Sequence, residues 1–298
     1  MTIQTQADID SLLSRDCTSL SGDLDLQNAT GGLDLSGVEE LSGYLGGRCS
    51  SSHGCNLTSL SSSTLNNQSV IKLDSYSKLR SISFGALAYY GEITLTNLSS
   101  LENVTLGWSN DTASVAANGA LGVPSHVQIQ ISGVPVLSHI SGLNLNNGDR
   151  AIILNISAPA LESCPLAITK AEHIVLSSGG KNGFDFDLSS LIEVKDIDIS
   201  GGDRWTLNAL QSFGTLVVHG KGMNEIGVPY YNVSKGGIVP SINLYDNPAL
   251  QFINSNAFAA IPVWKTIRLS NNTKLEQLLC FQNVTSATGV DIEGNIKE

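Results

Sequence analysis

The chain has 298 residues, of which 41% are apolar and only 14% are charged, and its formal net charge is -11. The apolar share can fill a packed core, so the composition excludes a wholly disordered chain. The acidic balance and the scattering of 16 basic residues exclude a nucleic-acid-binding protein, which needs a stripe of Lys and Arg against phosphates. No apolar run approaches the ~18 residues of a transmembrane helix, so we expect no direct membrane span in this chain.

The N-terminal segment has the clearest helical pattern of the chain. Thr5 and Asp8 have the spacing of a capping pair, and Ile9, Leu12 and Leu13 follow at helical spacing. The sequence therefore predicts a short helix within residues 5–16. Because a solenoid must cover its end coil, we expect this helix to close the N-terminal end of the fold.

Short segments with alternating apolar and polar residues recur along residues 17–298, as in strands with one buried face. These segments are residues 70–73, 92–95, 127–131, 152–156, 173–176, 196–199, 215–218, 241–244, 266–269 and 290–292. The first apolar residues of the last six are Ile174, Ile197, Leu216, Ile242, Ile267 and Val290, and their successive differences are 23, 19, 26, 25 and 23. Regular spacing in the low twenties predicts one solenoid coil per repeat.

A second apolar pair with the spacing L-x-x-[ILV] follows many of these strands and predicts a second wall of each coil. The pairs are Leu79 with Ile82, Leu101 with Val104, Leu137 with Ile140, Leu250 with Ile253, and Leu275 with Leu278. The longer interval after residues 92–95 predicts an inserted loop near residues 107–125. Asn247 and Asn272 match the leucine-rich-repeat spacing LxLxxN, in which the Asn amide bonds to turn backbone.

Most other coils lack an Asn at that position, which disfavours a regular leucine-rich-repeat horseshoe. We therefore predict one elongated, mainly β domain over residues 1–298. Its expected fold is an irregular right-handed parallel β-helix of about ten coils, with a short N-terminal capping helix.

The interior of the chain has features of an exported protein. Ten N-x-S/T sequons, about twice the number expected by chance, are candidate N-glycosylation sites; the alternative is that Asn, Ser and Thr are simply common in solenoid turns. The sequons begin at Asn28, Asn56, Asn67, Asn97, Asn103, Asn110, Asn155, Asn232, Asn271 and Asn283. Cys49 and Cys55 enclose a short loop and are expected to form a local disulfide. Cys164 and Cys280 are expected to be buried.

Paired carboxylates are the main candidates for catalysis, because β-helices also host polysaccharide-degrading enzymes. Asp185 with Asp187, and Asp196 with Asp198, alternate along predicted strands, and Asp198 could approach a carboxylate on the preceding coil. The alternative, which we favour, is that acidic side chains at outward positions keep the surface soluble. The five histidines are far apart in sequence, and His173 and His219 are expected at the starts of strands. No metal, phosphate or nucleophile motif is present. We expect no enzyme activity, no cofactor and no metal.

Aromatic residues are candidates for ligand contact, because aromatic rings can stack on sugars. Trp108, in the predicted loop, and the pair Tyr230 and Tyr231, beside Pro229, are the ones we single out. Trp205 and Trp264 are expected to pack at coil edges instead.

A family resemblance lies in residues 7–12 and in residues 17–26, where Cys17 precedes alternating Leu residues with an intervening Gly22. This pattern resembles the opening of receptor L-domains, which form the ligand-binding lobes of insulin- and EGF-type receptors. With its low charge, Ser/Asn-rich turns and sequons, the chain is most similar to the fungal Ecm-thirty-three/Sps-two type of GPI-anchored proteins. The resemblance implies an upstream Cys that pairs with Cys17, a signal peptide and an anchor sequence, none of which this sequence contains.

The function expected from this resemblance is structural and non-enzymatic. We expect a glycoprotein of the fungal cell wall or the outer face of the plasma membrane, which contributes to cell-wall integrity. Cell-wall polysaccharide or surface proteins are the expected partners. The alternatives are a receptor-like ectodomain that binds a glycan or a protein, and a polysaccharide-degrading β-helix enzyme. A sequon-free face with exposed aromatics would favour the first alternative, and carboxylates clustered in a groove would favour the second.

Overall fold

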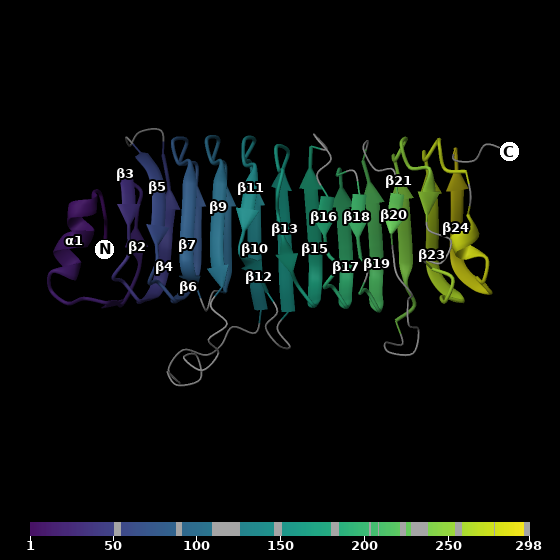
Figure 1. The fold of residues 1–298 in the computed structure, drawn as a ribbon, viewed down its shortest axis with the longest axis horizontal. Helices are drawn as coiled ribbons and strands as arrows, with labels where there is room; N and C mark the ends of the chain where they lie inside the picture. The colour runs from purple at the N-terminus through teal and green to yellow at the C-terminus, as the bar shows by residue number, and fades with distance from the viewer. Residues whose placement is uncertain are drawn as a thin grey trace. The chain divides into compact units, whose positions relative to one another are not determined.

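The computed structural model confirms the predicted fold class. It is mainly β, with 53% of residues in strands and 5% in helices, and its parallel sheets form a β-solenoid of about 9 turns with one helix near the N-terminus (Figure 1). The structure describes residues 1–50, 55–87, 91–108, 126–145, 151–179, 185–202, 204–207, 209–220, 225–227, 238–253, 258–276 and 278–294. In this part of the chain no helix is long and apolar enough to cross a membrane.

The chain forms two compact units, and the first comprises residues 1–144 and 155–163. Its elements are α1 (Gln6–Leu13), β1 (Ser19–Leu20), β2 (Leu24–Asp25), β3 (Thr30–Asp34), β4 (Glu40–Arg48), β5 (Asn56–Ser62), β6 (Asn67–Asp74), β7 (Ser81–Leu87), β8 (Glu92–Thr96), β9 (Asn103–Trp108), β10 (His126–Ser132), β11 (His139–Ser141) and β12 (Leu143–Asn144). One wall has the strand order β1-β4-β6-β8-β10, and the other has the order β11-β9-β7-β5-β3.

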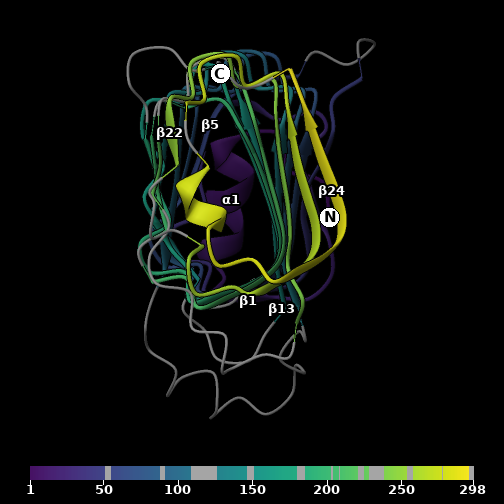
Figure 2. The same cartoon turned by 90° about the vertical axis from the view of Figure 1, so that its right-hand side faces the viewer.

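The second unit comprises residues 145–154 and 164–298. Its elements are β14 (Leu166–Ala167), β15 (Lys170–Ser178), β16 (Asp185–Asp187), β17 (Glu193–Ser200), β18 (Arg204–Thr206), β19 (Ser212–His219), β20 (Glu225–Gly227), β21 (Ser241–Tyr245), β22 (Phe252–Ile253), β23 (Val263–Ser270), a 3₁₀ helix (Leu279–Phe281) and β24 (Ser286–Glu293). One wall has the order β15-β17-β19-β21-β23-β24 and the other the order β16-β18-β20-β22. Figure 2 shows β22 and β24 on opposite walls. Strand β13 (Ala151–Ala158) has residues in both units.

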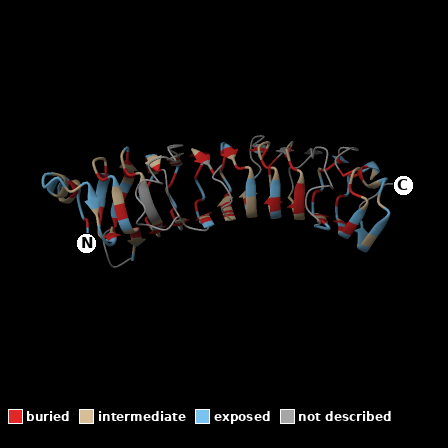
Figure 3. Cartoon of the chain, turned by 90° about the horizontal axis from the view of Figure 1, so that it is seen from below, coloured by how far each residue is buried: buried red, intermediate tan, exposed pale blue. Residues whose placement is uncertain are grey.

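The core of each coil follows from the period-two alternation in the sequence. In β17, for example, Ile197 and Ile199 are buried, while the residues between and beside them reach the surface. Figure 3 shows buried segments alternating with intermediate and exposed ones along the strands. The strands are parallel and in register, so Ile174, Ile197 and Leu216 are direct neighbours in successive coils. Each coil therefore covers the apolar residues of the previous one. The ten strand segments predicted from the sequence all fall within strands.

The corner after most strands of the larger walls has a positive φ, although the corners after β4, β13 and β15 do not. The residues at this corner are Ser75, Asn97 and Gly133 in the first unit, and Gly201, Gly220, Asp246, Asn271 and Gly294 in the second. Their backbone N–H groups continue the ladder: Asn97 donates to the carbonyl of Ser132 at 3.1 Å, and Asp246 to that of Ser270 at 3.1 Å. Asn, Asp and Gly tolerate this backbone conformation best, which explains the polar corners.

The N-terminal helix is where the sequence predicts it, and it covers the first coil. Asp8 accepts a hydrogen bond from the backbone N–H of Thr5 at 2.8 Å, as the predicted capping pair requires. Ile9 is fully buried, and the helix packs against β3 (Figure 1).

Asn247 and Asn272 form the predicted amide ladder inside the second unit. Both side chains are fully buried. The Nδ2 atom of Asn247 lies 3.0 Å from the carbonyl oxygen of Val218 and 2.9 Å from Oδ1 of Asn272. Asn272 in turn donates to the carbonyl oxygen of Leu244 at 2.9 Å. These bonds satisfy turn carbonyls that would otherwise be buried without partners.

Replacing Asn247 should therefore destabilise the second unit. We expect Asn247→Ala to lower the free energy of unfolding by roughly 1–3 kcal/mol, because it leaves buried carbonyl groups without a donor. The measurement is urea denaturation followed by circular dichroism. Asn243→Ala, at a half-buried outward position of β21, is the control and should stay within about 0.5 kcal/mol of the parent. Equal effects of the two substitutions would contradict the ladder's role.

Candidate functional site

The densest group of ionisable and aromatic side chains described lies on the outer face of the second unit's larger wall. Alternation turns the apolar residues of β15, β17, β19, β21 and β23 inward and leaves polar residues outside. We call this surface the charged face. It comprises Lys170, Glu172, His173, Glu193, Lys195, Asp196, Asp198, His219, Tyr245 and Arg268.

Close contacts between polar and charged side chains of neighbouring strands run across the charged face. His173 Nδ1 lies 3.1 Å from Asp196 Oδ2, directly across β15 and β17. His219 Nε2 lies 3.5 Å from Asp198 Oδ1, between β19 and β17. The Nζ of Lys195 lies 3.3 Å from Glu172 Oε1. Each pair is partly exposed, so it contributes little to stability and mainly holds the side chains in place.

An aromatic pair extends this arrangement to the next strand. The rings of His219 and Tyr245 are stacked, with centroids 4.7 Å apart and planes 10° apart. Partial burial, followed by the negative charges of Asp198 and Asp246, raises the pKa of Tyr245 above its usual value. The phenol is therefore a neutral hydrogen-bond donor at physiological pH. Sequence reasoning missed this group, because its histidines and aspartates are about twenty residues apart and meet only through the register of the coils.

The register does not support the possibility that Asp198 approaches a carboxylate on the preceding coil. Register places Val175 opposite Asp198 and His173 opposite Asp196, so each carboxylate faces an apolar or basic neighbour. Asp187 lies on β16 of the other wall, where its Oδ1 accepts the backbone N–H of Ser189 at 2.9 Å. This bond is typical of a turn. The side chain of Asp185 lies outside the described residues.

His219 also differs from the sequence-based expectation. We expected His173 and His219 to occupy the starts of strands. His219 is instead the last residue of β19, and His173 lies inside β15. Both side chains point outward, which is why they meet the aspartates of β17.

The residues predicted for ligand contact are not tested by the structure. Tyr230, Tyr231 and residues 109–125 of the predicted loop lie outside the described residues, as does the side chain of Trp108, whose backbone ends β9. Trp264 is fully buried in an aromatic cluster with Phe213, Phe258 and Phe281. It therefore packs in the interior and is not available to a ligand.

Sequon asparagines are distributed unevenly over the described surface. None lies within β15, β17, β19, β21, β23 or β24. In the first unit, Asn56 and Asn103 begin β5 and β9, and Asn97 occupies a corner. Asn271 and Asn283 lie in the turns beside β23 and β24. Asn110 and Asn232 lie outside the described residues, and so does the side chain of Asn67.

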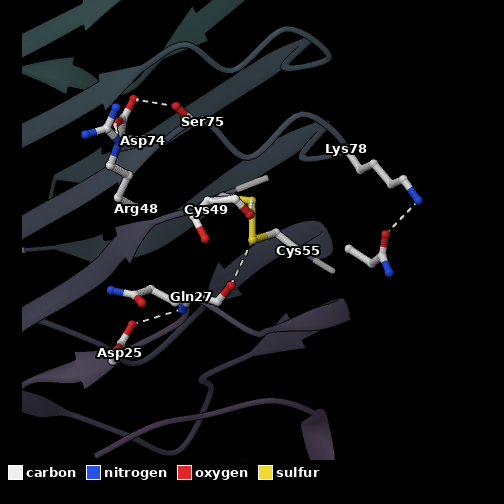
Figure 4. The surroundings of a disulfide bond; sticks show 10 residues. Asp25, Gln27, Arg48, Cys49, Cys55, Asp74, Ser75 and Lys78 are labelled. Atoms are coloured by element: carbon white, nitrogen blue, oxygen red, sulfur yellow. Dashed lines mark hydrogen bonds and ion pairs between the residues drawn. A yellow bond between two sulfur atoms is a disulfide. The ribbon is translucent and has the colours of Figure 1, made fainter. Parts of the chain in front are cut away.

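The predicted disulfide between Cys49 and Cys55 is present in the first unit (Figure 4). It joins the end of β4 to the start of β5, and the Sγ of Cys55 lies 2.9 Å from the carbonyl oxygen of Gln27 in the preceding coil. Cys17, Cys164 and Cys280 are free thiols, and the last two are buried as expected.

Asp74, next to Cys49, is a carboxylate of the first unit that is hydrogen-bonded by three side chains and paired with an arginine. It accepts hydrogen bonds from Asn97 Nδ2 at 2.9 Å, Thr96 Oγ1 at 3.0 Å and Ser75 Oγ at 3.0 Å, and Arg48 Nε lies 3.1 Å away. Figure 4 shows Ser75 and Arg48 beside Asp74. Burial alone would raise the pKa of Asp74, but the three hydrogen bonds and Arg48 outweigh it and hold the pKa below its usual value. This carboxylate therefore ties neighbouring coils together at one corner.

The described residues offer no group of three or more His, Cys, Asp or Glu side chains that could hold a metal ion. One hollow in the second unit is lined by Gln251, Thr273, Lys274, Leu275 and Glu276. One in the first unit is lined by Asn97, Ser99, Gly133, Val134, Pro135, Ser157 and Pro159. Neither hollow brings two carboxylates together, so neither has the pair of carboxyl groups that glycoside hydrolysis requires.

Comparison with known proteins gave no match among family models, curated protein sequences or solved structures. The interpretation of the charged face therefore depends on its own geometry.

Acid should weaken the first unit through Asp74. Because the pKa of Asp74 is lowered in the folded state, its stabilising effect is present above the unfolded-state pKa of about 3.9 and is lost as the pH falls. We expect Asp74→Asn to lower the melting temperature at pH 7 and to reduce its dependence on pH between about 5 and 2. Asp291→Asn, at an exposed position of β24, is the control. Parallel melting curves for Asp74→Asn and the parent across this range would contradict the assignment.

The thiols should differ in reactivity. Burial raises the pKa of both Cys164 and Cys280 to about 12, whereas Cys17 is only half-buried. Because the thiolate is the reactive form, iodoacetamide at pH 8 should label Cys17 in the native protein and reach the other two only after unfolding. Peptide mass mapping reads the result. Rapid native labelling of Cys164 would show that its coil opens under native conditions.

Proposed function

We propose that this chain is an exported, N-glycosylated and non-enzymatic structural protein of the cell surface, of the fungal cell-wall type that its N-terminal pattern resembles. The observation that carries the proposal is that asparagines inside and outside sequons differ in burial. The seven sequon asparagines whose side chains are described are all exposed or half-buried: Asn28, Asn56, Asn97, Asn103, Asn155, Asn271 and Asn283. The two fully buried asparagines, Asn247 and Asn272, are not in sequons.

Several of these sequons are compatible with a glycan in the folded state. Asn97 Nδ2 donates to Asp74 at 2.9 Å, and Asn271 Nδ2 donates to Asp246 at 3.0 Å. An N-glycosylated amide keeps one N–H, so each of these bonds can persist after modification. The disulfide between Cys49 and Cys55 supports the same location, because such bonds persist in oxidising compartments.

A structural role fits the way the fold is built. Stacked coils form long sheets in which every strand is hydrogen-bonded to its neighbours, so the surface is rigid over many residues. The carboxylates of Asp196 and Asp198 are engaged with histidines, which gives a degradative role less support. The receptor-like alternative has a specific observation in its favour, namely the sequon-free charged face with its stacked His219 and Tyr245.

The test is expression in a yeast secretory host with an added signal peptide, followed by intact mass measurement before and after endoglycosidase treatment. We expect a soluble product that loses several glycan masses. Asn271→Gln should remove one glycan, while Asn243→Gln, an asparagine outside any sequon on the neighbouring strand, should remove none. A folded, secreted product without any glycan would overturn the proposal.

A further inference from the structure

We propose that the charged face binds a neutral polysaccharide chain, laid across β17, β19, β21 and β23. This inference rests on the proposed function, because it names the partner of the surface module. Its support comes from the geometry, the charges and the accessibility of the charged face.

Two rows of outward residues run across these four strands. The first row holds Asp198, Val217, Asn243 and Arg268, and the second holds Ser200, His219, Tyr245 and Ser270, all as register partners. Adjacent strands are ~4.8 Å apart, so each row extends over about 14 Å. This is enough for a short run of sugar rings, and every position of the two rows except Val217 carries a polar group.

The stacked pair supplies a platform for a sugar ring. Ser270, a small residue, is the register partner of Tyr245 on the side away from His219, on which the ring of Tyr245 stacks. An apolar sugar face can pack there, while the protonated hydroxyl of Tyr245 donates a hydrogen bond. His219 is held in place by Asp198 at 3.5 Å, so the platform is ordered before any ligand arrives.

The charges favour a neutral ligand over a charged one. Asp196 and Asp198 would repel a polyanion, while Lys195 and Arg268 on the same face would repel a polycation. A chain of hydroxyl groups meets no such repulsion. Hydroxyls donate to Asp198 and accept from Arg268, and the amide of Asn243 can do both.

The face is also accessible. None of its strands contains a sequon, so N-glycans would not be attached within it. Its residues are half-buried or exposed, and a long ligand can approach from solvent without any opening of the fold. Neither of the hollows described above includes a residue of the charged face.

The experiment is co-sedimentation of the secreted protein with insoluble neutral β-glucan particles, with the bound fraction measured against particle concentration. Polygalacturonate and chitosan particles serve as the anionic and cationic comparisons. We expect saturable binding to the neutral glucan, which Tyr245→Ala weakens roughly five- to ten-fold. Tyr245→Phe keeps the ring and should keep most of the binding. Melting curves establish that both variants are folded.

Phe252→Ala is the matched control, because Phe252 is 50% exposed on β22 of the opposite wall. It should bind like the parent. Unchanged binding by folded Tyr245→Ala, or an equal loss in Phe252→Ala, would overturn the inference. Binding of the protein to the charged particles alone would also overturn it, as would binding to a wall protein without binding to any polysaccharide. A glycosylated product that binds none of the particles would contradict this inference alone. A folded, secreted product without glycans would contradict the proposed function.

Discussion

Parallel, in-register stacking of coils is the constraint on which the rest of the structure depends. Once Ile174 lies beside Ile197 and Ile197 beside Leu216, every other residue of these strands has a fixed neighbour in the next coil. Inward residues gain a dry core from this repetition. Outward residues gain a fixed lateral partner, whether or not that partner is close in sequence. The same register that buries the isoleucines therefore assembles the charged face.

Buried polar groups show how strictly the stacking must be satisfied at the turns. Asn247 and Asn272 are fully buried, and their amides bond to each other and to turn carbonyls. At one corner of the first unit, the carboxylate of Asp74 also links neighbouring coils, because it accepts hydrogen bonds from three side chains. Both devices join one coil to the next, so they reinforce the stacking that the apolar core begins.

The fold could be predicted from the sequence because its signal is local and repeated. Alternation located the strands, and the capping pair of Thr5 and Asp8 located the helix. The charged face could not be predicted, because coil lengths vary between 19 and 26 residues and the lateral neighbour of His219 cannot be counted from a fixed period. An error of one residue in register would turn the side chain to the other face. The neighbours of Asp198 could not be identified from the sequence for this reason.

The positive-φ corner that follows most strands of the larger walls has a wider consequence for how such a chain can change. It accepts serine, asparagine, aspartate or glycine, as Ser75, Asn97, Asp246 and Gly294 show, because it specifies little more than the sign of one dihedral angle. Because this requirement is so permissive, the chain segments between successive corners can lengthen or shorten. Whole coils can then be duplicated or deleted in evolution, or grafted by an engineer, and each new coil brings a fresh row of outward side chains to the same lattice.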